Sequence, residues 1–234
     1  MDKLLESGML PDWLLRIGIR RLNRQRLREE DRGSVEANQA HLMSFIAELY
    51  SMPIAINTQD ANEQHYELPP RFFELVLGRH LKYSCGYWDQ QANTLDLSEE
   101  RMLQMTMERA DLQDHQSILE LGCGWGSLTL AMARRFPQAH ITAVSNSNPQ
   151  RKFIQERLAN EQLRNVEVIT CDMNDLQLDQ QFDRVVSVEM FEHMKNYPQL
   201  FQMIYALLRP GGRLFVHIFS HARFAYHYEV KDER

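Results

Sequence analysis

The sequence predicts an α/β protein built on a doubly wound, mostly parallel sheet. From residue 111 onward, short apolar stretches alternate with longer stretches of helical periodicity, and strands that alternate with helices pair in parallel. A glycine-rich turn at residues 122–126 separates the first apolar stretch from the first of these helices. Right-handed crossovers place the loops that follow the strands at one edge of such a sheet, where ligands bind.

Each element of this pattern has a local signal. We expect strands at residues 117–121, 140–144, 166–170, 182–188 and 213–219, and helices at residues 127–135, 149–160 and 197–207. Pro149 suits the first turn of a helix, and Pro210-Gly211-Gly212 predicts a turn before the last strand. The charged residues 226–234 that follow the fifth predicted strand leave no room for a further strand, so we expect a core that is truncated after the fifth strand.

Three segments are expected along the chain: a helical segment at 1–62, a cap on the substrate side at 63–110, and the core at 111–234. Helices are predicted near residues 13–22 and at 35–51, 71–77 and 97–110. The first carries arginines between its apolar residues, so it either lies on an anionic membrane surface or packs on its own domain. Tyr87 and Trp88 belong either to the core or to a lid over the glycine turn.

The composition excludes several classes of protein. A net charge of −6 argues against a nucleic-acid surface. The three cysteines show no C-x-x-C or Cys/His zinc spacing, so we expect no metal site and a reducing, cytoplasmic location. The sequence has no signal peptide and no apolar run of about 18 residues, which predicts no membrane span.

The glycine turn predicts the class of ligand. Gly122, Gly124 and Gly126 alternate, so the backbone can turn sharply and approach a ligand closely. Glu120 precedes the turn, and its carboxylate would repel a phosphate but not a cationic, amine-bearing ligand. The turn therefore resembles the first motif of S-adenosylmethionine-dependent methyltransferases more than a dinucleotide site.

The loops after the second and third predicted strands are compatible with that cofactor. Asn146, Ser147 and Gln150 are neutral groups that can hydrogen-bond ribose hydroxyls, although Ser147 is also a good helix N-cap. Asp172 can accept a hydrogen bond from an adenine amino group while Met173 packs on the ring. A loop aspartate is otherwise a common turn residue.

The loop after the fourth predicted strand is the reactive candidate. Glu192 and His193 lie three and four residues after Glu189, so the three side chains share one face if the segment is helical. An alkylammonium has no lone pair until it loses a proton, which a carboxylate or an imidazole can accept. Alternatively, Glu192 and His193 cap the next helix or pair with each other, and Glu189 faces the sulfonium.

Five sequence blocks, taken in order, resemble a known family. Residues 67–73, 81–88, 119–127, 145–147 and 189–197 are similar to the coclaurine N-methyltransferase-like branch of the cyclopropane-fatty-acyl-phospholipid synthase family. The resemblance implies a Rossmann-like class I methyltransferase fold. It also implies that Tyr83 and Ser84 bind S-adenosylmethionine together with the glycine turn and the loops at residues 146–150 and 172–173. Glu192 and His193 are implied to act as the base for the acceptor.

The synthase branch of the same family methylates an alkene and uses a bound bicarbonate to deprotonate the resulting carbocation. The resemblance implies that Cys85, Glu192 and His217 would frame that anion. Residues 189–197 and 217–221 are closer to the amine methylators. The first expectation is therefore methylation of the nitrogen of a small-molecule amine. The alternatives are methylation of unsaturated phospholipid acyl chains and a cofactor-binding fragment without turnover.

Overall fold

The computed structural model describes residues 8, 10–56 and 68–227 of the 234-residue chain. The chain divides into two compact units, residues 1–49 with 221–234 and residues 50–220. Residues 57–67, where the helical segment expected at 1–62 meets the cap expected at 63–110, lie outside the described residues. Among those that are described, no helix combines the length and apolar character needed to cross a bilayer.

The first unit contains α2 (Asp12–Glu30) and most of α3 (Val35–Tyr50). The turn between the two helices is held by Asp31, whose carboxylate accepts hydrogen bonds from the Gly33 backbone N–H at 2.9 Å and from the Asn38 side chain at 3.0 Å. These two hydrogen bonds lower the pKa of Asp31. The apolar residues of α2 are largely exposed, including Trp13 at 63% and Leu22 at 65%.

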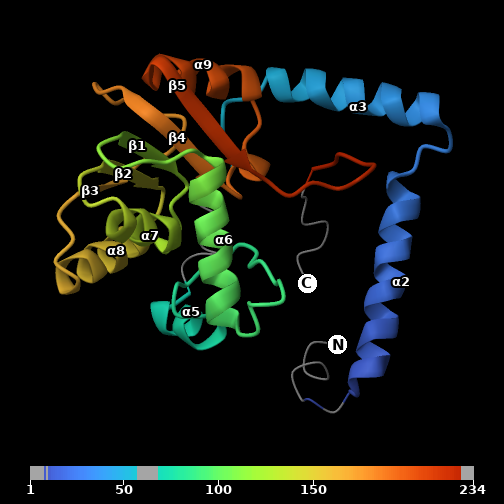
Figure 1. Ribbon diagram of the computed structural model, residues 1–234. Coiled ribbons are helices and arrows are strands. Elements are labelled where there is room, and N and C mark those ends of the chain that lie inside the picture. The colour runs from blue at the N-terminus through green and yellow to red at the C-terminus, as the bar shows by residue number, and fades with distance from the viewer. Residues whose placement is uncertain (1–7, 9, 57–67, 228–234) are drawn as a thin grey trace. The chain divides into compact units, whose positions relative to one another are not determined.

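The second unit is built on a five-stranded parallel sheet with the strand order β3-β2-β1-β4-β5 (Figure 1). The strands are β1 (Ser117–Leu121), β2 (His140–Ser145), β3 (Val166–Thr170), β4 (Phe182–Val188) and β5 (Leu208–His217). The order reverses at β1, which lies in the centre. The carboxyl ends of β1 to β4 therefore meet at one edge, beside the point where the topology changes direction.

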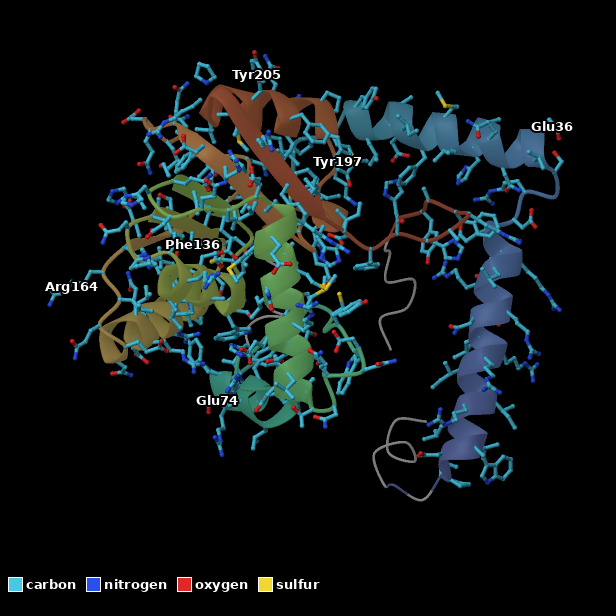
Figure 2. The ribbon with its side chains drawn as sticks, viewed as in Figure 1. Glu36, Glu74, Phe136, Arg164, Tyr197 and Tyr205 are labelled. Carbon is cyan, nitrogen blue, oxygen red and sulfur yellow. The ribbon has the colours of Figure 1, made fainter. Side chains whose placement is uncertain are left out.

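Helices cover both faces of this sheet, which confirms the predicted doubly wound fold class. The helices of this unit are α5 (Pro70–Val76), α6 (Leu95–Arg109), α7 (Ser127–Arg135), α8 (Asn148–Asn160) and α9 (Tyr197–Leu207), with a short 3-10 helix, η2 (Phe191–His193). In Figure 1, α7 and α8 lie on one side of the sheet and α9 lies on the other. Tyr205 is on the outer face of α9 and is 80% exposed (Figure 2).

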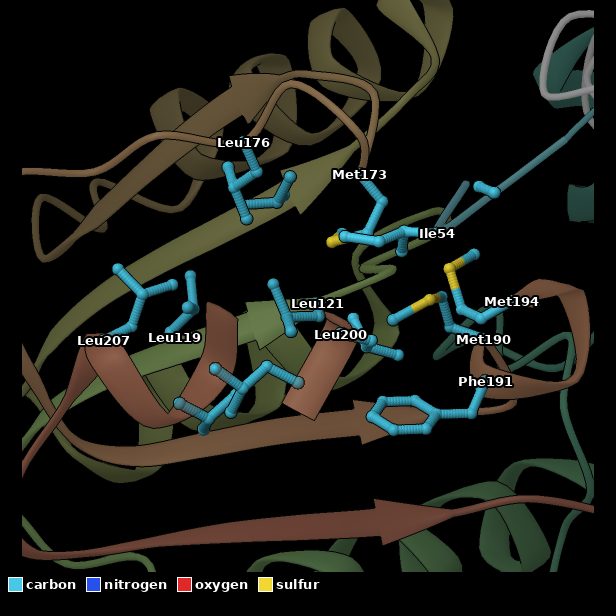
Figure 3. Close-up of a cluster of buried hydrophobic side chains, with 14 of the residues drawn as sticks. Ile54, Leu119, Leu121, Met173, Leu176, Met190, Phe191, Met194, Leu200 and Leu207 are labelled. Atoms are coloured by element: carbon cyan, nitrogen blue, oxygen red, sulfur yellow. The ribbon is translucent and has the colours of Figure 1, made fainter. Parts of the chain in front are cut away.

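Successive side chains of a strand point to opposite faces of the sheet, so a hydrophobic core forms on each face. In β1, Leu119 and Leu121 face the α9 side, whereas Ile118 faces α6 and α7. The α9-side core extends to the carboxyl edge of the sheet, where Met173 and Met190 pack with Ile54 (Figure 3). Several loops of the candidate site are thereby anchored in the hydrophobic core.

Strand β5 differs from the prediction. It begins at Leu208 rather than after a turn at 210–212, and it ends at His217 rather than at residue 219. Its pairing with β4 shifts in register between Phe182 and Arg184, so Gly211, at φ +80°, is accommodated inside an irregular strand. The Pro-Gly-Gly signal marks this local irregularity and not the start of the strand.

Candidate active site

The carboxyl edge of the sheet brings together the four loops that were predicted from the sequence. They follow β1, β2, β3 and β4, and all four strands run in the same direction. Backbone hydrogen bonds join the loop after β1 to β2, because the Gly122 and Cys123 N–H groups both donate to the Val144 carbonyl at 3.0 Å. The turn after β1 is therefore fixed against the end of β2.

The glycine turn has one closed side and one open side. Gly122 and Gly124 both adopt left-handed conformations, at φ +80° and φ +52°. A Cβ atom on Gly122 would lie 2.7 Å from the Met190 side chain, whereas a Cβ atom on Gly124 would meet nothing within 4 Å. Gly124 is therefore the position at which a ligand can approach the backbone closely.

Glu120 lies directly behind this turn, in β1, and is 4% exposed. The Thr129 hydroxyl of α7 donates a hydrogen bond of 2.5 Å to its carboxylate. Burial raises the pKa of Glu120 to about 8, and the Thr129 hydrogen bond and the charge of Lys82 only partly oppose this shift. A bound cation near the turn would favour the ionised form of this carboxyl group.

The loop after β2 uses most of its polar groups internally. Ser147 is the N-cap of α8, with its hydroxyl accepting from the Gln150 N–H at 3.4 Å, and Gln150 accepts a hydrogen bond from the Ser145 hydroxyl at 2.6 Å. Ser147 and Gln150 are 2% and 3% exposed, whereas Asn146 is exposed. The N-cap role expected for Ser147 is confirmed.

The loop after β3 is tied to Ala55, near the end of the described segment 10–56. The Asp172 carboxylate accepts hydrogen bonds from the Asn174 backbone at 2.8 Å and from its side chain at 2.9 Å. The Asn174 side chain in turn pairs with both backbone groups of Ala55. Asp172 thus has the turn role that was one of its two predicted alternatives, and Met173 is 7% exposed in the core.

The loop after β4 is not a continuous helix, so the condition under which Glu189, Glu192 and His193 would share one helical face is not met. Only Phe191–His193 are helical, as a single 3-10 turn, and Glu189 lies before it at φ +52°. The Glu189 N–H donates to the His217 carbonyl at 2.7 Å, which continues the β4–β5 hydrogen bonding. The left-handed backbone of Glu189 excludes this residue from a right-handed helix. Glu189 and Glu192 are therefore placed by different elements.

Glu192 and His193 both lie in η2 but differ in burial, since Glu192 is half-buried and His193 is exposed. One Glu192 oxygen, Oε1, accepts a hydrogen bond of 2.7 Å from the Phe219 backbone N–H. The other, Oε2, is buried and has no hydrogen-bond partner among the described residues. A carboxylate that is fixed by one oxygen and unsatisfied at the other is suited to accept a proton or a hydrogen bond from a ligand.

The aromatic segment near residue 83 lies at the surface and does not belong to the core. Tyr83, Tyr87 and Trp88 are 53%, 42% and 59% exposed. The Tyr83 ring meets Phe73 edge-on at 5.4 Å, and Phe73 lies 4.8 Å from the ring of Trp125 in the glycine turn. These contacts connect the predicted lid segment to the turn.

Lys82 is a site residue that the sequence analysis missed. It is 5% exposed, and its Nζ donates a hydrogen bond to the Ser84 hydroxyl. Burial lowers the pKa of Lys82, and the nearby Cys85 and Glu189 oppose that shift. Its only sequence signal is a lysine within an otherwise apolar and aromatic run, and that pattern does not distinguish a buried lysine from an exposed one.

The parallel sheet of order 3-2-1-4-5, with a glycine turn after its central strand and an acidic residue before that turn, defines a class I methyltransferase fold. The chain belongs to the mycolic acid cyclopropane synthetase family, whose family model matches residues 55–231. The predicted family is therefore confirmed.

Individual relatives come from both branches of this family. A (S)-coclaurine N-methyltransferase from Thalictrum flavum subsp. glaucum is 39% identical over 99% of this chain, which spans 64% of that enzyme. A crystal structure of coclaurine N-methyltransferase bound to N-methylheliamine and SAH has a TM-score of 0.91 and 38% identity, covering 99% of this chain and 67% of that one. A mycolic acid cyclopropane synthase complexed with SAH and CTAB has a TM-score of 0.62 and 26% identity, covering 70% of this chain and 57% of that one.

Proposed function

We propose that the protein is an S-adenosylmethionine-dependent methyltransferase that methylates the nitrogen of a small-molecule amine. The observation that carries this proposal is the state of Glu192, which is held by the Phe219 backbone at one oxygen while the other oxygen is buried without a partner. A protonated amine at this edge of the sheet would satisfy that oxygen. The similarity to coclaurine N-methyltransferases supports an amine as the acceptor.

The cofactor would lie against the open side of the glycine turn, at Gly124. Two similar structures contain SAH, the product that S-adenosylmethionine leaves after methyl transfer, which supports this choice of cofactor. A cationic cofactor would favour ionisation of the buried Glu120 beneath the turn, and the resulting carboxylate would stabilise that positive charge. The remaining proposed cofactor contacts are Tyr83, Ser84, Gly122, Gly126, Asn146, Ser147, Gln150, Asp172 and Met173.

In the proposed mechanism the chain removes a proton and orients the acceptor. When it is bound, the cofactor supplies an electrophilic methyl group on a sulfonium that departs as a neutral sulfide. Glu192, with His193 at the same turn, would accept the ammonium proton and so expose the nitrogen lone pair. The Glu189 carboxylate, near the end of β5, would stabilise the residual positive charge of the amine acceptor. Alignment of the two reactants supplies much of the remaining rate enhancement.

Methyl transfer from labelled cofactor to a panel of secondary amines tests this function. We expect the double variant Glu192→Gln, His193→Ala to lose methyl transfer by at least about 100-fold while cofactor affinity, measured by calorimetry, stays unchanged. Glu161→Gln, which removes an exposed ion-pair partner of Arg134, is the matched control and should keep full activity. Unchanged turnover in the double variant would refute the assignment, and cofactor uptake without transfer to any acceptor would favour a binding unit without turnover.

A second candidate function, methylation of unsaturated phospholipid acyl chains, is favoured by one contact. The Cys85 Sγ and His217 Nε2 atoms lie 3.9 Å apart, and with Glu192 these are the residues that the synthase branch would use to frame its anion. The exposed apolar residues and arginines of α2 would suit peripheral contact with an anionic lipid surface. Transfer of labelled methyl to unsaturated phospholipid vesicles, and not to amines, would establish this alternative.

A further inference from the structure

Three side chains with different ligand atoms converge at the acceptor side of the candidate site. They are Cys85, from the exposed loop that follows α5, Glu189, directly after β4, and His217, the last residue of β5. The Cys85 sulfur, a Glu189 carboxylate oxygen and a His217 ring nitrogen all lie within 4.8 Å of one another. They come from three segments that are far apart in the sequence, so no spacing motif reveals them.

The distance between two of these atoms is close to that in the ligand shell of a small transition-metal ion. Zinc binds sulfur at about 2.3 Å and histidine nitrogen at about 2.0–2.1 Å, so two tetrahedral ligands of these types lie roughly 3.5 Å apart. The Cys85 Sγ and His217 Nε2 atoms are 3.9 Å apart, and a change of a few tenths of an ångström would bring them to that distance. Thiolate, imidazole and carboxylate together are a ligand set that zinc accepts.

The backbone already holds two of the three ligands in register. Val188 of β4 pairs with His217 of β5, and the next N–H along, that of Glu189, donates to the His217 carbonyl. Glu189 has a left-handed backbone, at φ +52°, which is costly for a residue with a side chain and is typical of functional sites. The carboxylate and the imidazole are thus positioned before any ligand arrives.

We propose that Cys85, Glu189 and His217 form a three-ligand site for a thiophilic divalent cation such as Zn²⁺, and that the bound cation inhibits the enzyme. A fourth coordination position remains for water, as in other zinc sites with three protein ligands. The inhibitory part rests on the proposed function, because a coordinated Glu189 is no longer available to an amine acceptor. Binding would form a metal–sulfur bond and release the Cys85 thiol proton to solvent.

The charges around the cluster set the conditions for binding. Burial raises the pKa of the Cys85 thiol, and Glu189 adds to that rise, so the metal must displace a proton that is firmly held. Lys82 is the nearby cation that opposes binding. Burial lowers the pKa of Lys82, which favours its neutral form, and Glu99, Glu120 and Glu189 add negative charge around it.

Cobalt titration of the full chain tests the site without any turnover. Co²⁺ is the probe because a bound thiolate produces a near-ultraviolet charge-transfer band. We expect about one equivalent of Co²⁺ to generate this band in the wild-type chain, and Zn²⁺ to displace it. Cys85→Ser should abolish the band, and Glu189→Gln and His217→Gln should each weaken binding by at least about tenfold.

Cys171→Ser is the matched control, because Cys171 is also partly exposed but lies outside the cluster, and it should keep the band. Circular dichroism of each variant verifies that the fold is retained. A wild-type chain without the band at saturating Co²⁺, or a Cys85→Ser variant that keeps it, would overturn the site.

Inhibition is measured separately on the methyl-transfer reaction. The Zn²⁺ concentration that halves the wild-type rate should rise by at least about tenfold in Cys85→Ser relative to the uninhibited rate of the same variant, and a chelator should restore the wild-type rate. A cobalt band without inhibition by Zn²⁺ would overturn the inhibitory role alone. If no acceptor is methylated, the proposed function fails while the cobalt titration still decides whether the metal site exists.

Discussion

Replacing Glu120 by glutamine tests whether the carboxyl group beneath the glycine turn is held in its neutral form. Glutamine has nearly the same shape and keeps an oxygen that can accept the Thr129 hydrogen bond, but it cannot ionise. Burial raises the pKa of Glu120 from 4.5 to about 8. Between pH 4.5 and about pH 8, the Glu120 carboxyl group of the folded chain therefore keeps a proton that the unfolded chain has released.

The sign and size of the effect follow from proton linkage. Because the folded state binds more protons, the free energy of unfolding falls as the pH rises, by about 1.4 kcal/mol per pH unit. The loss begins near the unfolded pKa of 4.5, is complete near the folded pKa of about 8, and amounts to about 5 kcal/mol. Glu120→Gln lacks this contribution, so its stability relative to the wild type should rise steadily across the window.

Urea unfolding of both chains between about pH 5 and about pH 9 measures this difference. Contributions from other groups, such as the raised pKa of Glu99, occur in both chains and cancel when the two curves are subtracted. Without cofactor, the variant should gain on the wild type at each step up to about pH 8 and then stay level. Parallel curves would show that Glu120 ionises normally in the folded chain and would refute the reasoning.

Two further substitutions test the turn and the buried lysine. Gly124→Ala and Gly211→Ala place alanine at left-handed positions with open space around the new Cβ, so each should lower the free energy of unfolding by about 1–2 kcal/mol in thermal denaturation. Only Gly124→Ala should weaken cofactor binding in calorimetry. Equal cofactor affinities of the two variants would show that no ligand approaches the backbone at Gly124. Lys82→Met removes a charge that lowers the pKa of the Cys85 thiol, so alkylation of Cys85 by iodoacetamide should shift to higher pH. Lys152→Met, on α8, is the control, and an unchanged alkylation profile in Lys82→Met would contradict the assigned contact.

Much of the fold follows from local signals. Strands β1, β3 and β4 and helices α7 and α9 have the predicted bounds. These elements are marked by glycine after β1, by proline in the first turns of helices and by short apolar runs. Each of these signals lies within a few residues of the element that it predicts. The four loops were predicted to meet at one edge of the sheet because the strands run parallel to one another.

The features that the sequence did not predict depend on contacts between distant segments. The early start of β5 accompanies its irregular pairing with β4, and Glu189 combines a left-handed backbone with a hydrogen bond to the His217 carbonyl. Glu189 likewise joins Cys85 and His217, a contact between a loop and the ends of two strands that lie more than a hundred residues further along the chain. Periodicity and spacing carry no information about such pairs.

Calorimetric titration of the chain with S-adenosylmethionine tests the central claim most directly. If the loops after β1 to β4 form the cofactor site, the wild-type chain should bind about one equivalent with saturation, and Gly124→Ala should bind markedly more weakly. A wild-type chain that takes up no cofactor would contradict the account.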